Sequence, residues 1–431
     1  MKKMILPILL LVLLLIFAGC EKKSAGYQVG IGSVDITPQG GAQIAGNSEA
    51  KQSSSVDFPL SAKAAIFALG EEKVAVVTLD TLKYPTELAE QAMARIAQET
   101  SVPADRVMIV SSHTHSGPLY ASYEDMLVES VVEAVKLAEA DLEPCQLAVA
   151  STEVGNVAHN RRLLVKGEAW NDWMIPTSTR YLYSAEGPMD PQLQVLAVTK
   201  KDGTYKTILW NYACHANSNN TDAISADYPG RVQEYVAESL GYALTALFLP
   251  GACGDVNPNN TVESTAIPLG DGILECLNNL TALETQSLSF ETTILNIPAR
   301  ENPVFEAEDI QKKWPDQYSK YENYYNSARP NQPQSYKSYI CLFRLGDSVA
   351  MISDPGELFC QYGLDIKAAS PYSFTMAVEQ TNGAIGYIPT LTAYANKSYE
   401  TWYGEHSNIS VNAGEMIRDT SIKMLTRPSG E

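Results

Sequence analysis

The chain has 431 residues, of which 45% are hydrophobic, so it can bury a large core in one big domain or two ordinary ones. Its formal net charge of −19 gives a surface that repels phosphate backbones, and no run of Lys or Arg outside the N-terminus offsets that charge. Composition therefore argues against nucleic acid as a partner.

The N-terminus has the features of an export signal. Two lysines precede an apolar run over residues 4–18, and small residues then lead to Cys20. The run is shorter than the roughly 20 residues that span a bilayer, so we expect residues 1–20 to be a cleaved signal peptide. The ending FAGC resembles a bacterial lipobox with Phe17 in place of the commoner Leu. We therefore expect an exported protein held at a bacterial membrane by a lipidated Cys20 and a tether over 21–26, with simple secretion as the alternative.

Beyond the signal, apolar β-rich runs alternate with helical patterns. The runs predict strands over residues 63–69, 73–80, 106–112, 146–151, 193–200, 206–215 and 243–251. Helices are expected over residues 85–100, 124–140, 228–241 and 272–279. This alternation is typical of an α/β domain with a mixed, partly parallel β-sheet core flanked by helices. No internal repeat is visible in the sequence.

The segment 301–337 differs in composition, because it is rich in Lys, Pro, Gln, Asn and Tyr. Strand patterns resume after it, at residues 338–346 and 348–354. We therefore interpret the segment as a surface insertion rather than a domain boundary. The expected organisation is a single large domain over residues 27–431.

Four polar clusters directly follow predicted strands. They are SSHTHSGP at 111–118, CHANSNN at 214–220, GACGDVNPN at 251–259 and DPGELF at 354–359. In α/β sheets, the loops that leave the carboxyl ends of strands form the ligand crevice. We therefore expect these four loops to converge on one site.

Two of the chain's five histidines, His113 and His115, stand two residues apart in the first cluster. That spacing directs both rings to one face of a strand, or lets both approach one centre in a loop. Imidazole is the commonest metal ligand, and a second imidazole can carry protons. His215, at the end of another strand, favours a metal site, whereas rings satisfied by backbone carbonyls are the alternative. His159 and His406 have no such setting.

Local sequence leaves the roles of other polar side chains open. Glu357 follows Pro355, which suits a first helical turn, so its carboxylate is expected near a helix N-terminus, where helix capping is the simplest account. Arg161 either binds an anion or a developing oxyanion, or is solvated at the surface. The tyrosine-rich segment 386–403 belongs either to the core or to a substrate cleft.

Taken together, the motifs resemble those of the neutral/alkaline non-lysosomal ceramidase family in its catalytic, N-terminal domain. In the family's order, they are GSVDITP, HTHSGP, the NR of HNRR, NYACHANS, GDVNPN, PGE, GYIPT and AYANKSYE. The resemblance implies a zinc-dependent hydrolase that cleaves the amide of an N-acyl sphingolipid or related N-acyl compound by attack of zinc-bound water. It also implies which side chains hold the Zn²⁺ ion, namely His113, His215, Glu357 and Tyr387.

The same resemblance assigns roles around the substrate. It places His115, Arg161 and Tyr399 in the catalytic machinery, with His115 giving a proton to the leaving amine. It also places Tyr394 and Asn257 in contact with the substrate.

The chain departs from the family in two places. Family enzymes have GDVSPN, with a serine assigned a catalytic role, whereas this chain has Asn257, whose amide cannot act as a serine-type nucleophile. Family enzymes also continue into a C-terminal β-sandwich, so we expect the catalytic domain here without that sandwich. These departures leave two alternatives open, a non-catalytic zinc-containing surface lipoprotein that binds ligands, and a zinc esterase.

Overall fold

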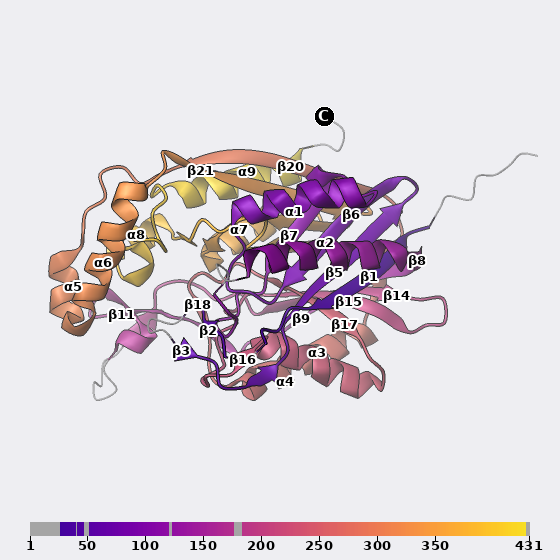
Figure 1. Cartoon of the computed structure of the whole chain (residues 1–431), viewed down its shortest axis with the longest axis horizontal. Helices are drawn as coiled ribbons and strands as arrows, with labels where there is room; N and C mark the ends of the chain where they lie inside the picture. Colours follow the sequence, from indigo (N-terminus) through magenta and orange to yellow (C-terminus); the bar gives the residue numbers. More distant parts are fainter. Residues whose placement is uncertain (1–25, 40, 47–50, 120–122, 176–182, 428–431) are drawn as a thin grey trace, which may run out of the picture.

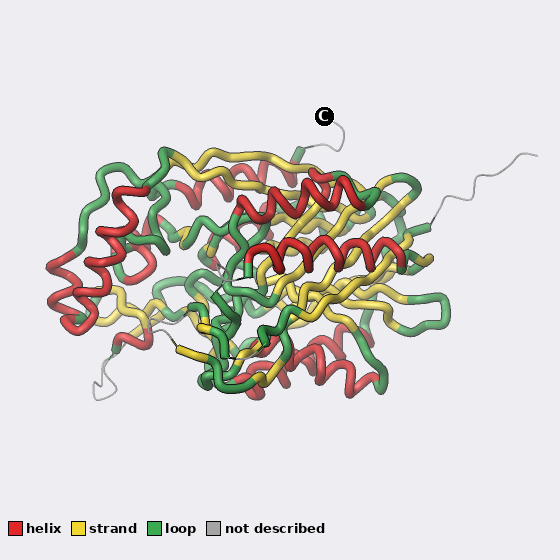
Figure 2. Tube along the Cα trace, in the orientation of Figure 1, coloured by secondary structure: helices red, strands yellow, loops and turns green. Residues whose placement is uncertain are grey.

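The computed structural model of the chain describes residues 26–39, 41–46, 51–119, 123–175 and 183–427. The expected signal peptide and Cys20 lie outside the described residues. Among the residues that are described, no helix has both the length and the apolar character needed to cross a bilayer. The chain forms mixed β-sheets covered by helices (Figure 1, Figure 2), which confirms the expected α/β class with partly parallel sheets.

The first large sheet has the strand order β7-β6-β5-β1-β8. Strands β1, β5 and β6 pair antiparallel, and β7 then lies parallel to β6 after the crossover helix α1. Helix α2 follows and leads to the edge strand β8. The bounds are β1 Gln28–Asp35, β5 Ser61–Leu69, β6 Glu72–Leu79, α1 Thr86–Glu99, β7 Val107–Ser111, α2 Glu124–Ala140 and β8 Glu143–Pro144.

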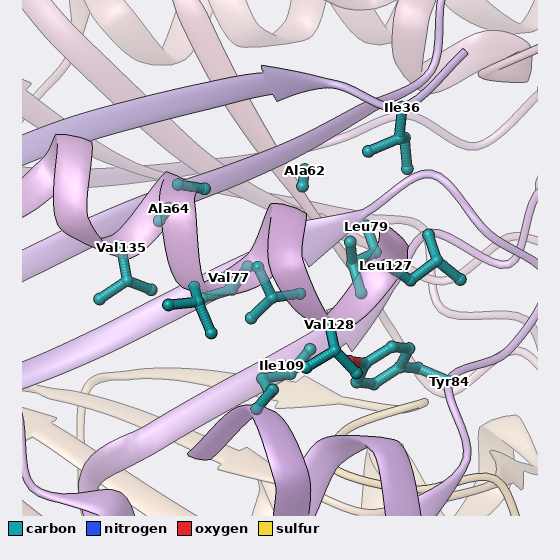
Figure 3. Close-up of a cluster of buried hydrophobic side chains, with 14 of the residues drawn as sticks. Ile36, Ala62, Ala64, Val77, Leu79, Tyr84, Ile109, Leu127, Val128 and Val135 are labelled. Atoms are coloured by element: carbon teal, nitrogen blue, oxygen red, sulfur yellow. The ribbon is translucent and has the colours of Figure 1, made fainter. Parts of the chain in front are cut away.

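Helices α1 and α2 cover the outer face of this sheet. On α2, Leu127, Val128 and Val135 recur at helical spacing and share a buried cluster with Val77 of β6 and Ile109 of β7 (Figure 3). Burial of each such side chain contributes about 1.5–3 kcal/mol relative to its exposure. The apolar stripe of the helix therefore holds the sheet and the helix layer together.

The second large sheet has the same connectivity as the first, and the third has it without the final edge strand. The strand orders are β17-β15-β14-β9-β19 and β24-β22-β21-β20. In each sheet the strands pair antiparallel except for one parallel pair, β15 with β17 or β22 with β24, whose two strands are connected by a helix. In the second sheet the bounds are β9 Gln146–Glu153, β14 Gln192–Thr199, β15 Tyr205–Tyr212, α3 Asp227–Leu240, β17 Thr245–Pro250, α4 Val262–Asn278 and β19 Thr281–Ala282. In the third they are β20 Leu288–Pro298, β21 Ser335–Leu345, β22 Val349–Ser353, α7 Cys360–Ala369, β24 Phe374–Val378 and α9 Ala413–Thr426.

We call these three units the repeats, comprising residues 28–144, 146–282 and 288–426. No repeat is visible in the amino-acid sequence, because only the order of strands and helices recurs. The inner faces of the three sheets share one buried core, in which Phe67 of β5 lies 5.4 Å from Phe343 of β21, measured between ring centroids. Each outer face has its own core beneath α1 and α2, α3 and α4, or α7 and α9. Figure 1 shows the first two of these helix pairs on opposite sides of the strands.

The segment that we expected to be a surface insertion contains α5 Ala307–Lys313 and α6 Tyr318–Ala328, at one end of the molecule in Figure 1. Trp314 and Tyr321 of this segment are buried against Trp402. The remaining short elements are β2 Gln43–Ile44, β3 Lys51–Gln52, β4 Val56–Phe58, β10 Ala158–Asn160, β11 Arg162–Val165, β12 Glu168–Asn171, β13 Tyr183–Ala185, β16 Ile224–Ser225, β18 Val256–Pro258, β23 Glu357–Leu358, β25 Tyr387–Ile388 and α8 Leu391–Asn396. Single turns of 3-10 helix cover Ala104–Arg106, Asp172–Met174, Pro315–Gln317, Arg329–Asn331 and Tyr399–Thr401.

Candidate metal centre

The four loops that we expected to converge do meet, although they leave three sheets rather than one. The loop after β7 carries His113 and His115, the loop after β15 carries His215, and the loop after β22 carries Glu357. Backbone hydrogen bonds join the repeats at this point; for example, the His115 N–H donates to the Ala216 carbonyl at 3.1 Å. The site therefore lies where the repeats come together.

One nitrogen from each of His113, His115 and His215 lies within 4.8 Å of the other two. The ring centroids of His113 and His215 are 4.7 Å apart, and those of His113 and His115 are 5.0 Å apart. His113 has a φ of 62°, a left-handed conformation that residues other than glycine rarely adopt. This turn lets both histidines of the HTH motif face a common centre.

Backbone carbonyls fix the tautomers of two of these rings. The Nδ1 of His113 lies 2.7 Å from the Leu82 carbonyl oxygen, and the Nδ1 of His215 lies 2.7 Å from that of Cys253. A carbonyl only accepts, so each Nδ1 carries the proton and each Nε2 presents its lone pair to the centre. The Nε2 of His113 is buried and makes no hydrogen bond among the described residues. The carbonyls thus satisfy one nitrogen of each ring and leave each Nε2 facing the centre of the cluster, where the His215 Nε2 also lies 3.3 Å from the Arg161 Nη1.

Glu357 reaches the cluster from a short strand rather than from a helix. The helix that we expected near Pro355 begins at Cys360, the first residue of α7, and Glu357 lies in β23. There it pairs in parallel register with Tyr387 of β25. Helix capping of Glu357 was therefore wrong, because the chain first forms a bridge to β25 and only then turns into α7.

The carboxylate of Glu357 lies between two of the histidines. Its Oε2 is 3.4 Å from the Nε2 of His113 and 3.3 Å from the Nε2 of His215. Burial alone would raise the pKa of Glu357, but the facing His113 and His215 hold that pKa well below its usual value. Glu357 is consequently an ionised carboxylate in a buried position, and the two Nε2 atoms that face it carry lone pairs rather than protons.

The Tyr387 ring packs beside the same cluster. Its side chain is only 4% exposed, and its ring centroid lies 5.3 Å from the Arg161 guanidinium carbon. Burial, with the negative charge of Glu357, raises the pKa of the Tyr387 hydroxyl well above its usual value. The phenol therefore keeps its proton unless a nearby cation compensates for the phenolate charge.

His115 also has a backbone carbonyl at its Nδ1, but it is only partly buried, whereas His113 and His215 are buried. Its Nδ1 lies 3.2 Å from the Gly46 carbonyl. Gly46 has a φ of +79°, and a Cβ there would lie 2.7 Å from the same Nδ1, so only glycine fits this close approach. Burial, with the neighbouring His113 and His215, holds the pKa of His115 well below its usual value. The ring is therefore neutral at physiological pH.

Arg161 is buried, with 3% exposure, which excludes a solvated surface role. Its Nη1 is 3.3 Å from the His215 Nε2 and donates to the Asn257 Oδ1 at 3.1 Å, whereas its Nε donates to the Glu400 Oε1 at 2.9 Å. Glu400 is fully buried and also accepts from Arg162 at 2.6 Å, so it bridges two buried guanidinium groups, while Glu186 provides a second carboxylate to Arg162. Sequence reasoning missed Glu400, although it ends the AYANKSYE motif beside Tyr399.

Aromatic rings surround the guanidinium. The Tyr399 ring lies 5.6 Å from that of Tyr387 and stacks on His406 at 4.7 Å. His406, which had no functional setting in the sequence, also accepts the Tyr387 backbone N–H at 2.8 Å. Trp173 lies 5.2 Å from the Arg161 guanidinium carbon and remains 51% exposed, so it is the solvent-facing member of this group.

Tyr394 is hydrogen-bonded to a different arginine, Arg300. Its hydroxyl accepts from the Arg300 Nη2 at 2.9 Å, and the Arg300 guanidinium carbon lies 5.0 Å from the Tyr394 ring centroid. The contact with substrate that the resemblance implies for Tyr394 stays a prediction.

His159 belongs to a separate, open cavity of about 450 Å³, which Tyr183 also lines. Its Nε2 lies 2.8 Å from the Asp172 carboxylate and its Nδ1 lies 2.7 Å from the Asn259 Oδ1. The hydrogen bond to Asp172 raises the pKa of His159, and both ring nitrogens face oxygen atoms. Both ring nitrogens of His159 thus already have oxygen partners, outside the histidine cluster.

The donor set of the cluster fits a zinc ion. Zinc in proteins is bound tetrahedrally by His nitrogen and carboxylate oxygen at about 2.0–2.2 Å, so two such ligand atoms lie about 3.3 Å apart. The separations of 3.4 and 3.3 Å from the Glu357 Oε2 to the two Nε2 atoms match that spacing. His115 is close enough to be either a third histidine ligand or a proton carrier.

The fold and the cluster together define an α/β protein with a candidate metal centre of histidines and one carboxylate. The chain belongs to the neutral/alkaline non-lysosomal ceramidase family, because the signature of the family's N-terminal part matches residues 27–266.

Two further comparisons agree with that assignment. The neutral ceramidase of Pseudomonas aeruginosa is 26% identical to this chain over 185 residues, which is 38% of this chain and 26% of that protein's own length. The crystal structure of neutral ceramidase from the same organism superimposes with a TM-score of 0.71 at 17% identity, over 93% of this chain and 74% of that one. A ceramidase in complex with C2 gives the same TM-score and identity, over 75% of its chain. At this identity the structural likeness shows the fold alone.

Proposed function

We propose that this protein is a zinc-dependent hydrolase of the ceramidase type, which cleaves the amide of an N-acyl sphingolipid or a related N-acyl compound. The observation that carries the proposal is the meeting of the His113 Nε2, the His215 Nε2 and the Glu357 Oε2 with 3.3 to 3.4 Å between carboxylate and imidazoles. Membership of the ceramidase family supports the class of reaction.

In the proposed site, His113, His215 and Glu357 hold the zinc ion, with Tyr387 as the fourth protein ligand. Bound zinc supplies a Lewis acid for the amide carbonyl and lowers the pKa of a coordinated water toward about 7. Asn257 cannot act as a nucleophile and is engaged by Arg161, so water is the attacking group.

Arg161 is placed to stabilise the oxyanion that forms when the carbonyl is attacked. Its Nη2 is buried and makes no hydrogen bond among the described residues, although Asn257 and Glu400 fix the rest of the guanidinium. A preorganised donor of this kind is worth about 2.7–4 kcal/mol in a transition state. We expect this nitrogen to donate to the oxyanion.

His115 serves as the proton carrier in this proposal. Because its pKa lies well below the usual value, it is neutral before the reaction and can accept a proton from the attacking water. It then gives that proton to the leaving amine. Tyr399 and the exposed face of Trp173 supply an aromatic wall for the apolar part of the substrate.

Metal analysis joined to a hydrolysis assay tests the proposal. The purified protein is expected to contain zinc, to release fatty acid from N-acyl sphingosines or N-acyl amino acids, to lose activity on chelation and to regain it with zinc. His113→Ala should abolish both zinc content and turnover. Zinc without turnover on any substrate would favour a non-catalytic binding protein, and turnover of simple esters alone would favour an esterase.

We also propose that the protein is exported and anchored through a lipidated Cys20, on the basis of the N-terminal sequence. In a bacterial host, the wild-type protein should fractionate with membranes, and Cys20→Ser should move it to the soluble fraction. Membrane association that is unchanged in Cys20→Ser would contradict lipid anchoring.

A further inference from the structure

We propose that Glu379 is a positioning residue that fixes the orientation of the His215 imidazole through Cys253. Glu379 takes no part in the chemistry described above. The inference deepens the proposed function and rests on it for the metal, although the orientation of His215 can be measured without one.

Glu379 directly follows β24 and is fully buried at the end of the core that the three sheets share. Its Oε2 accepts the backbone N–H of Cys253 at 3.0 Å, and its Oε1 accepts the Cys253 thiol at 3.1 Å. Its own N–H donates to the Pro250 carbonyl at 3.0 Å. Both carboxyl oxygens thus hold one residue of the second repeat, from a position in the third.

Two carbonyls hold the His215 Nδ1, that of Val256 at 3.1 Å and, more closely, that of Cys253. The Cys253 carbonyl lies 2.7 Å from the His215 Nδ1, which donates its proton to it. Glu379 therefore reaches the imidazole through a single intervening residue. A shift or rotation of Cys253 would turn the ring and move the Nε2 that faces Glu357.

Gly254, the residue after Cys253, links the same loop to Glu357, another proposed zinc ligand. The Gly254 N–H donates to the Leu358 carbonyl at 2.9 Å, and a Cβ on Gly254 would lie only 2.3 Å from the Glu357 carbonyl oxygen. The loop is thus packed directly against the backbone that carries Glu357. By holding Cys253, Glu379 sets the spacing between a ligand of the second repeat and a ligand of the third.

The chemical cost of this arrangement supports a functional role. A buried carboxyl group is unfavourable in an apolar core, and an apolar side chain of similar size commonly gives a more stable fold. Partners that orient metal-ligating histidines typically change metal affinity by about 10-fold to 100-fold when they are removed. The Cys253 carbonyl is such a partner, and Glu379 holds it in place.

Glu379→Met tests the inference, because Met is unbranched and of similar length but provides no oxygen acceptor. Glu379→Gln is the conservative variant, since its amide oxygen still accepts the Cys253 N–H. Asp190→Asn is the matched control, because Asp190 is a buried carboxyl whose partners are the Gln192 N–H and Lys367. Two readouts are taken on folded protein, the ¹⁵N spectrum of the histidine rings without metal and zinc affinity by competition with a chelator.

We expect Glu379→Met to convert His215 from the single Nδ1–H tautomer to a mixture and to weaken zinc binding about 10-fold to 100-fold. Glu379→Gln and Asp190→Asn should retain the tautomer and bind zinc within about threefold of wild type, because neither removes the acceptor that holds Cys253. A Glu379→Met protein with unchanged tautomer and affinity would overturn the inference. If that variant does not fold, a tenfold loss in Glu379→Gln overturns it, because the effect would then come from charge.

The two readouts separate this inference from the proposed function. A wild-type protein that binds no zinc would contradict the proposed metal site, yet a tautomer change in Glu379→Met would still support the role of Glu379. Conversely, tight zinc binding that is the same in wild type and Glu379→Met would leave the function intact and contradict the positioning role.

Discussion

His113 and His115 lie two residues apart, yet their surroundings suit different tasks. Both rings have a backbone carbonyl at Nδ1, but the His113 Nε2 faces Glu357 at 3.4 Å, whereas His115 is only partly buried and its pKa lies well below the usual value. A neutral imidazole can either bind a metal or carry a proton, so geometry alone leaves both tasks open to His115. Replacement of the His115 ring by the amide of glutamine separates the two tasks, because loss of a metal ligand lowers zinc content and loss of a proton carrier lowers only kcat.

We predict that His115→Gln lowers kcat by about 10²-fold to 10⁴-fold, the usual contribution of a general acid–base group. The zinc content of the purified variant should equal that of wild type, as measured by metal analysis. His113→Gln is the matched control and should lose zinc together with activity. Loss of zinc in His115→Gln as well would make His115 a third histidine ligand instead of a proton carrier.

Asn257 stands where family enzymes have a serine, and the structure shows what it contacts. Its Oδ1 accepts from the Arg161 Nη1 at 3.1 Å, while Glu400 holds the same guanidinium at its Nε. A hydrogen bond to a charged group contributes about 1.5–3 kcal/mol, and Glu400 keeps Arg161 in place when Asn257 is lost. We therefore predict that Asn257→Ala lowers kcat/KM by about tenfold, in steady-state assays on the best N-acyl substrate. A loss beyond about 10³-fold would instead indicate direct contact with the reacting atoms.

At the scale of elements, the turn between β22 and β23 contains a buried acid. Burial raises the pKa of Asp354 to about 8, and its Oδ1 accepts the Gly356 N–H at 3.1 Å. Because the folded state holds the proton more tightly than the unfolded chain does, this group lowers stability as pH rises from about 4 toward about 8. The Asp354 carboxyl therefore lowers the free energy of unfolding increasingly as pH rises, and it does so in the turn that leads to Glu357.

We predict that Asp354→Asn removes this part of the pH dependence, because the amide keeps an oxygen for Gly356 and cannot ionise. Urea unfolding at pH 5 and pH 8 should show that wild type loses at least about 2 kcal/mol more than the variant over that interval. Parallel losses in the two proteins would show that Asp354 does not titrate between those pH values.

Most elements could be predicted from the sequence, because their apolar runs and helical spacing reflect local burial. Helix α4 is an exception, since it begins at Val262 and not at residue 272. Pro268, Gly270 and Gly272 are residues that usually interrupt a helix, although all three lie inside α4. A Cβ at Gly270 would lie 2.4 Å from the Tyr235 ring. The glycines permit close helix packing, a non-local cause that no local pattern reveals.

The candidate site was predictable only in part for the same reason. The histidines and Glu357 follow predicted strands, so sequence located their loops. The pairing of β23 with β25, which sets Glu357 beside Tyr387, depends on residues that are distant along the chain. Glu379 could not be predicted from the sequence, because a single acidic residue after a strand has no distinctive spacing. Its proposed role depends on its contact with Cys253, which is distant along the chain.

At the scale of the whole molecule, the proposed ligands are divided among the three repeats. His113 belongs to the first repeat, His215 to the second, and Glu357 with Tyr387 to the third. The repeats also share the central core, so the ion would join units that already pack together. A ligand set of this kind couples metal binding to the unfolding of the entire chain.

Zinc should therefore raise the stability of the whole protein and not that of one loop. For an ion that binds only the folded state, free zinc at about 1,000 times its Kd adds about 4 kcal/mol to the free energy of unfolding. We predict a single unfolding transition whose midpoint rises with zinc concentration in differential scanning calorimetry. His113→Ala, His215→Ala and Glu357→Ala, one from each repeat, should each abolish the rise. His159→Ala, outside the cluster, should retain it. A rise that survives any one of the three cluster variants would mean that its repeat is not joined through the ion.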